Sequence, residues 1–174
     1  FWKSDEVDID EPKKLMAFSD EKVLSIKWKN AYKGENNMGS FVPDFSSQNL
    51  FFSDASGKVL SLNANTGNEN WSAELSFLAS GTAAGFGIVA VSDIKGNVIA
   101  LDQKDGSKLW SSNVKGEVLS KVAIDAQIVV VKTGSGELLG LNKENGDIEW
   151  SYRSTLPLLT VRGSSSPVIA DDKV

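Results

Sequence analysis

The sequence predicts an all-β fold of repeated four-stranded antiparallel sheets, and three observations carry that prediction. First, Trp71, Trp110 and Trp150 stand 39 and 40 residues apart. Second, turn glycines keep the same step, at Gly57, Gly96 and Gly136 and again at Gly67, Gly106 and Gly146. Third, short β-branched runs and turn residues fill each repeat, without helical periodicity. Repeats of this length and strand content are typical of β-propeller blades.

Each repeat is expected to supply four strands joined by tight turns. The first strands are expected at residues 41–45, 82–84 and 121–124. The β-branched runs 88–91 and 128–131 predict second strands that are buried on both faces. A glycine turn, a third strand, a second glycine turn and a last strand with the tryptophan follow in each repeat. The three predicted blades span approximately residues 39–75, 80–115 and 118–154.

The repeated tryptophan has two possible roles. An indole on a surface strand can serve as a ligand platform, but its recurrence at one place in every repeat favours packing between neighbouring blades. Burying such a side chain removes ~150–250 Å² from water, so it contributes strongly to a packed interface. We therefore expect the tryptophans to be structural blade-packing residues; they are Trp28, Trp71, Trp110 and Trp150.

The two ends of the predicted propeller region, 21–174, carry parts of blades. Residues 23–29 resemble the last strand of a blade and are expected to form a closing strand. Residues 166–174 resemble the beginning of blade 3 and predict the start of a fourth blade. Propellers use about four to eight blades, so we expect the N-terminal part of a longer protein. Residues 1–20 alternate charges with few apolar residues and are expected to be a solvated tether.

Composition excludes several classes of function. The net charge of −5 argues against a nucleic-acid partner, because phosphate binding requires a basic surface. The sequence has no cysteine and no histidine, which removes thiol nucleophiles, histidine bases and zinc sites built on those residues. No apolar run is long enough to predict a membrane-spanning helix. We therefore expect no catalytic residues, no metal and no cofactor.

One connection between repeats is longer than the others. From Trp150 to Ser166 is 16 residues, against 9 and 10 in the two earlier connections. The inserted loop, residues 155–165, is apolar and carries a single arginine. Two interpretations are equally compatible with the spacing. The loop folds back and caps a blade, or it is a protein-binding patch in which aliphatic anchors surround the arginine. The candidate partner-binding residues are Leu158, Leu159, Val161 and Arg162.

The motif Leu-Asn/Asp-x-x-x-Gly-x-x-x-Trp, at residues 62–71, 101–110 and 141–150, resembles the quinoprotein-type (PQQ-like) propeller repeat. The loop sequence Leu-Leu-Thr-Val-Arg-Gly-Ser-Ser-Ser-Pro, at residues 158–167, resembles the corresponding loop of the BamB family. These are lipoproteins of the outer-membrane β-barrel assembly machine. The resemblance implies an eight-bladed propeller on the periplasmic face of the outer membrane of a Gram-negative bacterium. Its lipid anchor is not part of this sequence.

The resemblance also implies a partner. In that family this loop contacts BamA, and the matching positions here are Leu159, Val161 and Arg162. Val161 departs from the more usual leucine, which preserves an aliphatic anchor. The implied function is a non-enzymatic scaffold that binds the periplasmic region of BamA through residues 155–165 and assists the insertion of unfolded outer-membrane protein clients.

Two alternatives share the same repeat. One is a ligand-binding or sensor propeller. The other is a quinoprotein dehydrogenase, but those enzymes hold their cofactor with a vicinal disulfide, and this sequence has no cysteine.

Overall fold

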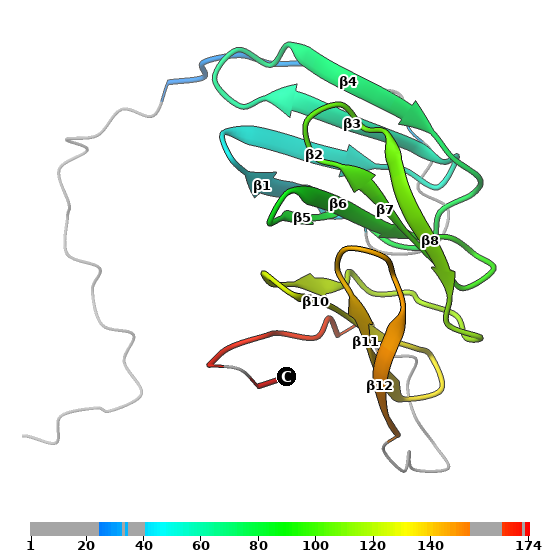
Figure 1. Ribbon diagram of the computed structural model, residues 1–174. Helices are drawn as coiled ribbons and strands as arrows, with labels where there is room; N and C mark the ends of the chain where they lie inside the picture. The colour runs from blue at the N-terminus through cyan, green and yellow to red at the C-terminus, as the bar shows by residue number, and fades with distance from the viewer. Residues whose placement is uncertain (1–24, 33, 35–40, 154–164, 172) are drawn as a thin grey trace, which may run out of the picture.

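The computed structural model describes residues 25–32, 34, 41–153, 165–171 and 173–174 (Figure 1). The expected tether, residues 1–20, lies outside these residues, as does the inserted loop up to residue 164. Within the described residues the chain forms twelve strands in three four-stranded antiparallel sheets, which confirms the predicted all-β blade fold. We call the sheets blade 1, blade 2 and blade 3.

The strands follow one another in chain order within each blade. Blade 1 contains β1 (Asp44–Ser46), β2 (Asn49–Ser53), β3 (Lys58–Asn63) and β4 (Glu69–Glu74). Blade 2 contains β5 (Ala83–Gly85), β6 (Ile88–Ser92), β7 (Asn97–Asp102) and β8 (Lys108–Asn113). Blade 3 contains β9 (Ala123–Ile124), β10 (Ile128–Lys132), β11 (Glu137–Asn142) and β12 (Ile148–Arg153).

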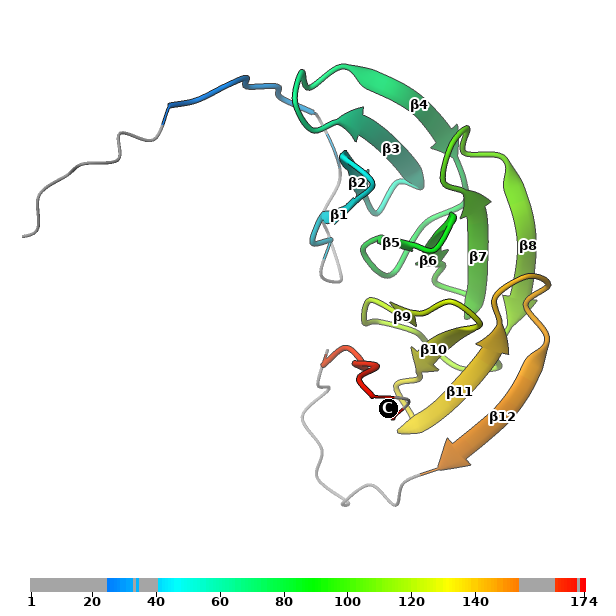
Figure 2. The same ribbon diagram turned by 60° about the vertical axis from the view of Figure 1, so that its left-hand side comes forward.

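The three blades fan around a common centre (Figure 2). The short strands β1, β5 and β9 lie on the inside of the arc, and β4, β8 and β12 lie on its outside. The β-branched run of β6 is buried along its whole length because blade 2 has a neighbour on each face. The innermost strands β1 and β9 begin later than expected, because β1 pairs with β2 only from Asp44 and β9 pairs only with Val129 and Val130.

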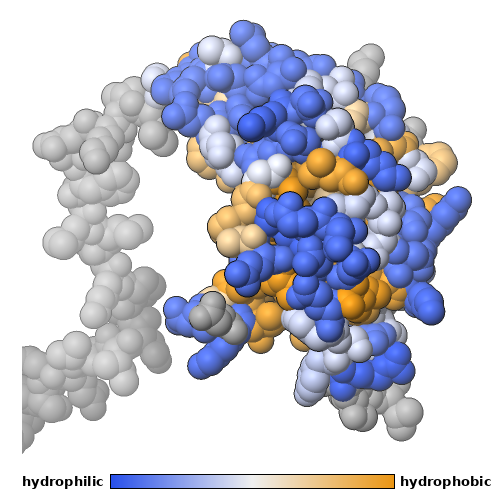
Figure 3. Space-filling model, viewed as in Figure 1, coloured by the Kyte–Doolittle hydropathy of each residue, from blue (hydrophilic) through white to orange (hydrophobic). Residues whose placement is uncertain are grey.

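Two apolar cores lie between the blades. The residues between blade 1 and blade 2 are Phe51, Val59, Trp71, Leu78, Val89, Val91, Ile99 and Leu101. The core between blade 2 and blade 3 includes Ile88, Val98, Trp110, Val118, Val129, Val131, Leu139 and Leu141. On the face shown in Figure 3, apolar residues gather in bands between the middle blade and its neighbours. Burial of this apolar area is the main favourable term that joins one blade to the next.

An ion pair and a hydrogen bond also join the inner strands. The Asp44 carboxylate on β1 accepts a hydrogen bond from the Ala84 amide of β5 at 2.8 Å. The same carboxylate forms an ion pair with Lys121, just before β9, at 2.9 Å. One side chain thus connects all three blades near the centre of the arc.

The described parts of the two partial blades predicted at the ends of the propeller region contain no sheet. The closing strand was expected at residues 23–29, but its described part, residues 25–29, contains no strand. In the described part of residues 166–174, Ala170 and Lys173 form a single bridge. A β-strand requires a partner for its backbone groups, and neither segment pairs with another strand among the described residues.

Candidate functional site

The hairpins β2–β3, β6–β7 and β10–β11 lie at one rim of the arc, which we call the hairpin rim. The outer strands end at the same rim, where three residue pairs meet: Lys58 with Glu74, Asn97 with Asn113, and Glu137 with Arg153. Each connection to the next blade therefore starts there. We call the opposite rim, with the β3–β4, β7–β8 and β11–β12 turns, the turn rim.

Each hairpin on the hairpin rim is fixed by one polar side chain at its first turn position. The buried Asp93 carboxylate accepts hydrogen bonds from the Lys95 and Asn97 amides, both at 2.8 Å, and from the Asn97 side chain at 2.7 Å. Asp54 accepts the matching bonds in blade 1, and Thr133 occupies this position in blade 3. These bonds satisfy the turn amides locally and hold the hairpins in one conformation.

The predicted partner-binding residues Leu158, Leu159, Val161 and Arg162 lie outside the described residues. The structure does describe Arg153, which ends the strand before the inserted loop, and Ser165, the last residue of the loop. Before it, Arg153 at the end of β12 forms an ion pair with Glu137 at 3.1 Å. After it, Ser165 accepts a hydrogen bond from the Lys132 ammonium at 2.6 Å. Because Lys132 ends β10 and Glu137 begins β11, Arg153 and Ser165 both lie at the hairpin rim of blade 3.

The tryptophans contact the turn rim. Three indoles donate from Nε1 to a backbone carbonyl near the next turn: Trp28 to Ala64, Trp71 to Gln103, and Trp110 to Lys143, at 2.8, 3.1 and 2.7 Å. The same three rings cover Gly67, Gly106 and Gly146. Trp71 and Trp110 are only 8% and 7% exposed. Trp28 therefore makes the same contact with blade 1 that Trp71 makes with blade 2 and Trp110 makes with blade 3. The described residues around Trp28 form no strand.

Trp150 has a different environment. A Cβ placed on Gly140 would lie 2.2 Å from the Trp150 ring, so the indole lies over its cross-strand partner on β11. The indole is partly buried, whereas Trp71 and Trp110 are buried between blades.

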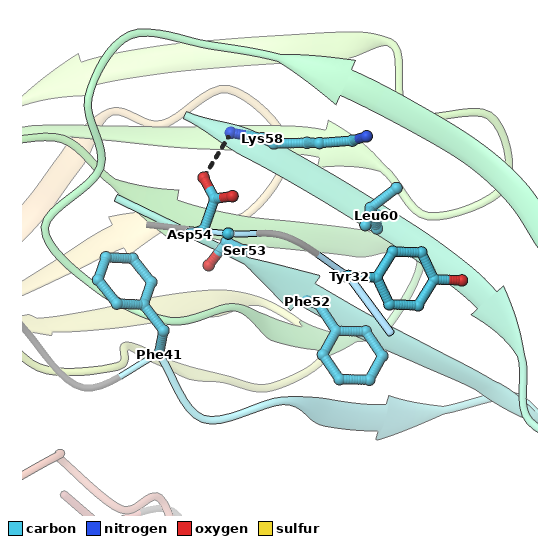
Figure 4. A pocket seen from close by; sticks show the side chains of 8 residues that line it. Tyr32, Phe41, Phe52, Ser53, Asp54, Lys58 and Leu60 are labelled. Carbon is cyan, nitrogen blue, oxygen red and sulfur yellow. Dashed lines mark hydrogen bonds between the residues drawn. The ribbon is translucent and has the colours of Figure 1, made fainter. Parts of the chain in front are cut away.

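A pocket of about 240 Å³ is lined by Tyr32 and Gly34 on one side and by blade 1 on the other (Figure 4). Tyr32 and Phe52 stack in it with ring centroids 6.4 Å apart, and Asp54 accepts a hydrogen bond from the Lys58 backbone at its edge. Phe52 is paired with Leu60, as Val91 is paired with Ile99 in blade 2. That second pair is buried against blade 1, so the pocket floor corresponds to a surface that packs between blades.

Among the residues that the structure describes, no group of three or more His, Cys, Asp or Glu residues is placed to hold a metal ion. No helix in this part of the chain is long and apolar enough to cross a membrane. The hydroxyl and amide of Ser107 lower the pKa of the Asp105 carboxyl, which is an exposed turn group on the turn rim.

Sequence reasoning missed two polar residues that connect blades. One is Asp44, described above. The other is Gln103, whose side chain donates to Ser46 at 3.1 Å and accepts from the Gly87 amide at 3.2 Å. Gln103 is buried, and its carbonyl also accepts from Trp71. The sequence carried no clear signal for Gln103, because the equivalent residues in the other repeats are Ala64 and Lys143, and lysine is also long and polar.

The tryptophan-docked blades define a β-propeller of the PQQ-like repeat type. A family model described as outer membrane protein assembly factor BamB matches residues 55–174. The chain therefore belongs to the BamB family. The names in this family describe assembly factors and not enzymes.

Individual relatives agree with this assignment. The chain is 38% identical over 161 residues to the outer membrane protein assembly factor BamB of Nitrosomonas eutropha, which covers 92% of this chain and 39% of that protein. It is 39% identical over 130 residues to the protein of the same name from Vibrio cholerae, covering 72% of this chain and 34% of that protein. The chain thus spans less than two fifths of the length of these relatives.

Solved structures show the same fold. The crystal structure of BamB from Moraxella catarrhalis matches 77% of this chain and 44% of its own, with a TM-score of 0.65 and 23% identity. A europium-containing methanol dehydrogenase matches 76% of this chain and 27% of its own, with a TM-score of 0.61 and 16% identity. At these identities both likenesses concern the fold alone.

Proposed function

We propose that this protein is a non-enzymatic scaffold of the outer-membrane β-barrel assembly complex that binds the periplasmic region of BamA through residues 155–165. The observation that carries the proposal is the placement of the loop ends. Lys132 with Ser165, and Glu137 with Arg153, fix both ends at the hairpin rim of blade 3. A long apolar loop that starts and ends on a rigid sheet is suited to present side chains to a partner.

The roles of the loop residues follow from their chemistry. Leu158, Leu159 and Val161 supply aliphatic anchors that lose contact with water when a partner covers them. Arg162 supplies a planar cation that pairs with a carboxylate or a carbonyl on the partner. Family membership supports the choice of partner, since the relatives are named as outer membrane protein assembly factors.

The proposal extends to location and clients. An N-terminal lipid would hold the propeller on the periplasmic face of the outer membrane, and residues 1–20 would link that lipid to the first blade. The clients are unfolded outer-membrane proteins on their way to BamA. In this arrangement the blades act as a rigid support, and the hairpin rim faces the assembly machine.

The test is the affinity of the purified protein for the periplasmic region of BamA. Leu159→Ala and Arg162→Ala are each expected to weaken binding by about tenfold, which corresponds to about 1.4 kcal/mol for an interface anchor. The matched control is Ile148→Ala, since Ile148 is an exposed aliphatic residue on β12 of the same blade. Unchanged affinity of both loop variants, with an unchanged unfolding midpoint, would remove the loop from the interface.

A further inference from the structure

Two large apolar side chains lie exposed next to each other on the hairpin rim. Phe77 lies in the connection from β4 to β5, and Ile94 lies in the turn of the β6–β7 hairpin. The Ile94 amide donates to the Phe77 carbonyl at 3.2 Å, and Leu78 bridges Asp93 in antiparallel register. Phe77 and Ile94 are therefore opposite residues, which project to the same side. They are 60% and 54% exposed, and we call them the Phe77–Ile94 patch.

The repeat itself does not require apolar residues at these two positions. In blade 3 the Gly134 amide donates to the Glu117 carbonyl at 2.8 Å, which is the same contact one repeat later. Glu117 and Gly134 thus take the places of Phe77 and Ile94. In blade 1, Ala55 follows Asp54 as Ile94 follows Asp93. The exposed apolar pair is specific to blade 2 and is not explained by blade architecture.

Hydrogen bonds hold the backbone of the turn that carries Ile94. The Asp93 side chain, only 3% exposed, accepts three hydrogen bonds from the turn that carries Ile94. The hairpin also packs closely on the connection that leaves β8, since a Cβ on Gly96 would lie 2.5 Å from the Gly116 carbonyl. A preorganised apolar surface loses little conformational entropy when a partner binds, which favours affinity.

The surroundings of the patch indicate which partner it fits. The patch in blade 2 and the loop ends in blade 3 lie on the same rim of adjacent blades. The β10–β11 hairpin of blade 3 has small exposed tip residues, Gly134 and Ser135, and the exposed Glu117 lies opposite Gly134. A partner surface that extends from the loop to the patch therefore meets one long side chain, the Glu117 carboxylate, beside that tip. Two exposed cations are carried by the surrounding turns: Lys95 follows Ile94 in the same turn, and Lys115 precedes Gly116, whose carbonyl lies against Gly96 of that turn.

We propose that the Phe77–Ile94 patch is a second contact for the protein that residues 155–165 are proposed to bind, so this inference rests on the proposed function. The matching partner surface has an apolar centre that covers Phe77 and Ile94 and carboxylates that face Lys95 and Lys115. An aromatic anchor at the centre with charged groups at the edge is typical of the strongest part of a protein interface.

The experiment compares variants of the full-length protein for affinity to the purified periplasmic region of BamA. Phe77→Glu and Ile94→Ala introduce the residues found at the equivalent places in blade 3 and blade 1, so the fold is expected to tolerate both. Phe77→Glu should weaken binding by on the order of tenfold and Ile94→Ala by about three- to tenfold. Leu109→Ala, an exposed aliphatic residue on β8 near the turn rim, is the matched control and should not change the affinity.

A second measurement does not rely on a change in affinity between variants or on the stability of a charged variant. A photo-crosslinking phenylalanine analogue at position 77 should capture purified BamA, whereas the same analogue at position 109 should not. Loss of affinity in the patch variants together with this crosslink supports the proposal. If Arg162→Ala weakens binding but both patch variants bind like the original protein, only the patch is rejected. If the original protein does not bind at all, the proposed function and the patch are both rejected.

Discussion

The contact between an indole and a turn glycine is the smallest repeated unit of this molecule. Trp71 lies on Gly106 of the next blade, and Trp110 lies on Gly146 in the same way. Each glycine has a positive φ, 75° and 77°. A Cβ at either position would lie 2.5 Å from the indole Cε3 atom. Glycine is therefore required there twice, once for the turn and once to let the ring of the preceding blade approach the backbone.

A substitution can separate these two requirements. Gly106→Ala combines backbone strain with a clash against Trp71, whereas Gly87→Ala at φ 89° brings backbone strain alone, since no other atom lies within 4 Å. We expect Gly106→Ala to lower the free energy of unfolding by about 1–3 kcal/mol more than Gly87→Ala, as overpacking of a close contact does. Equilibrium denaturation with urea measures both. If both variants lose the same free energy of unfolding, the close approach of the Trp71 ring does not require a residue without a side chain at position 106.

At the scale of the element, the hairpins differ in how they are fixed although they share one shape. Asp54 and Asp93 accept hydrogen bonds from turn amides through a carboxylate, and Thr133 does the same through a hydroxyl. A carboxylate bonds turn amides more strongly than a hydroxyl, because a charged acceptor strengthens the bond. The β6–β7 hairpin, whose turn carries Ile94 of the Phe77–Ile94 patch, has the stronger acceptor, Asp93.

Asp93→Ala is therefore expected to destabilise the protein by about 1–3 kcal/mol, because it leaves the Lys95 and Asn97 amides without their acceptor. Asp93→Thr copies the residue of blade 3 and should cost less. Hydrogen exchange of residues 93–97 would detect the local effect, with faster exchange in the alanine variant. Exchange rates that are the same in the alanine and threonine variants would contradict a specific role for the acceptor.

The elements that a repeat defines locally could be predicted from sequence. The β-branched run 88–91 lies within β6, and Gly96 and Gly106 lie in turns at positive φ. Both signals are short-range, since they depend on strand propensity and on the turn conformation of one residue. They were enough to predict an all-β blade fold.

The contacts between elements could not be predicted in this way. Asp44 meets Ala84 and Lys121 only because the inner strands converge near the centre of the arc. The closing strand expected at residues 23–29 stays a prediction: its described part, residues 25–29, contains no strand, and strand formation depends on a neighbour, which a local pattern does not contain. The partner residues in the loop were proposed from a resemblance and stay a prediction.

At the scale of the whole molecule, the two rims differ in their environment. The turns of the turn rim at Gly67, Gly106 and Gly146 are covered by indoles from the preceding segment or blade. The hairpin rim carries the ends of the inserted loop and the exposed Phe77–Ile94 patch. Because the turn rim contributes to packing between blades, its turns are poorly suited to recognition. The hairpin rim is therefore the side that we expect to face a partner.

Hydrogen–deuterium exchange of the full-length protein, with and without the purified periplasmic region of BamA, tests this expectation most directly. The partner should slow exchange in residues 93–97 and 153–165 on the hairpin rim. Exchange should stay unchanged in residues 64–67, 103–106 and 143–146 on the turn rim. Slower exchange confined to the turn rim, or none at the hairpin rim despite binding, would contradict the assignment of the hairpin rim as the partner-binding side.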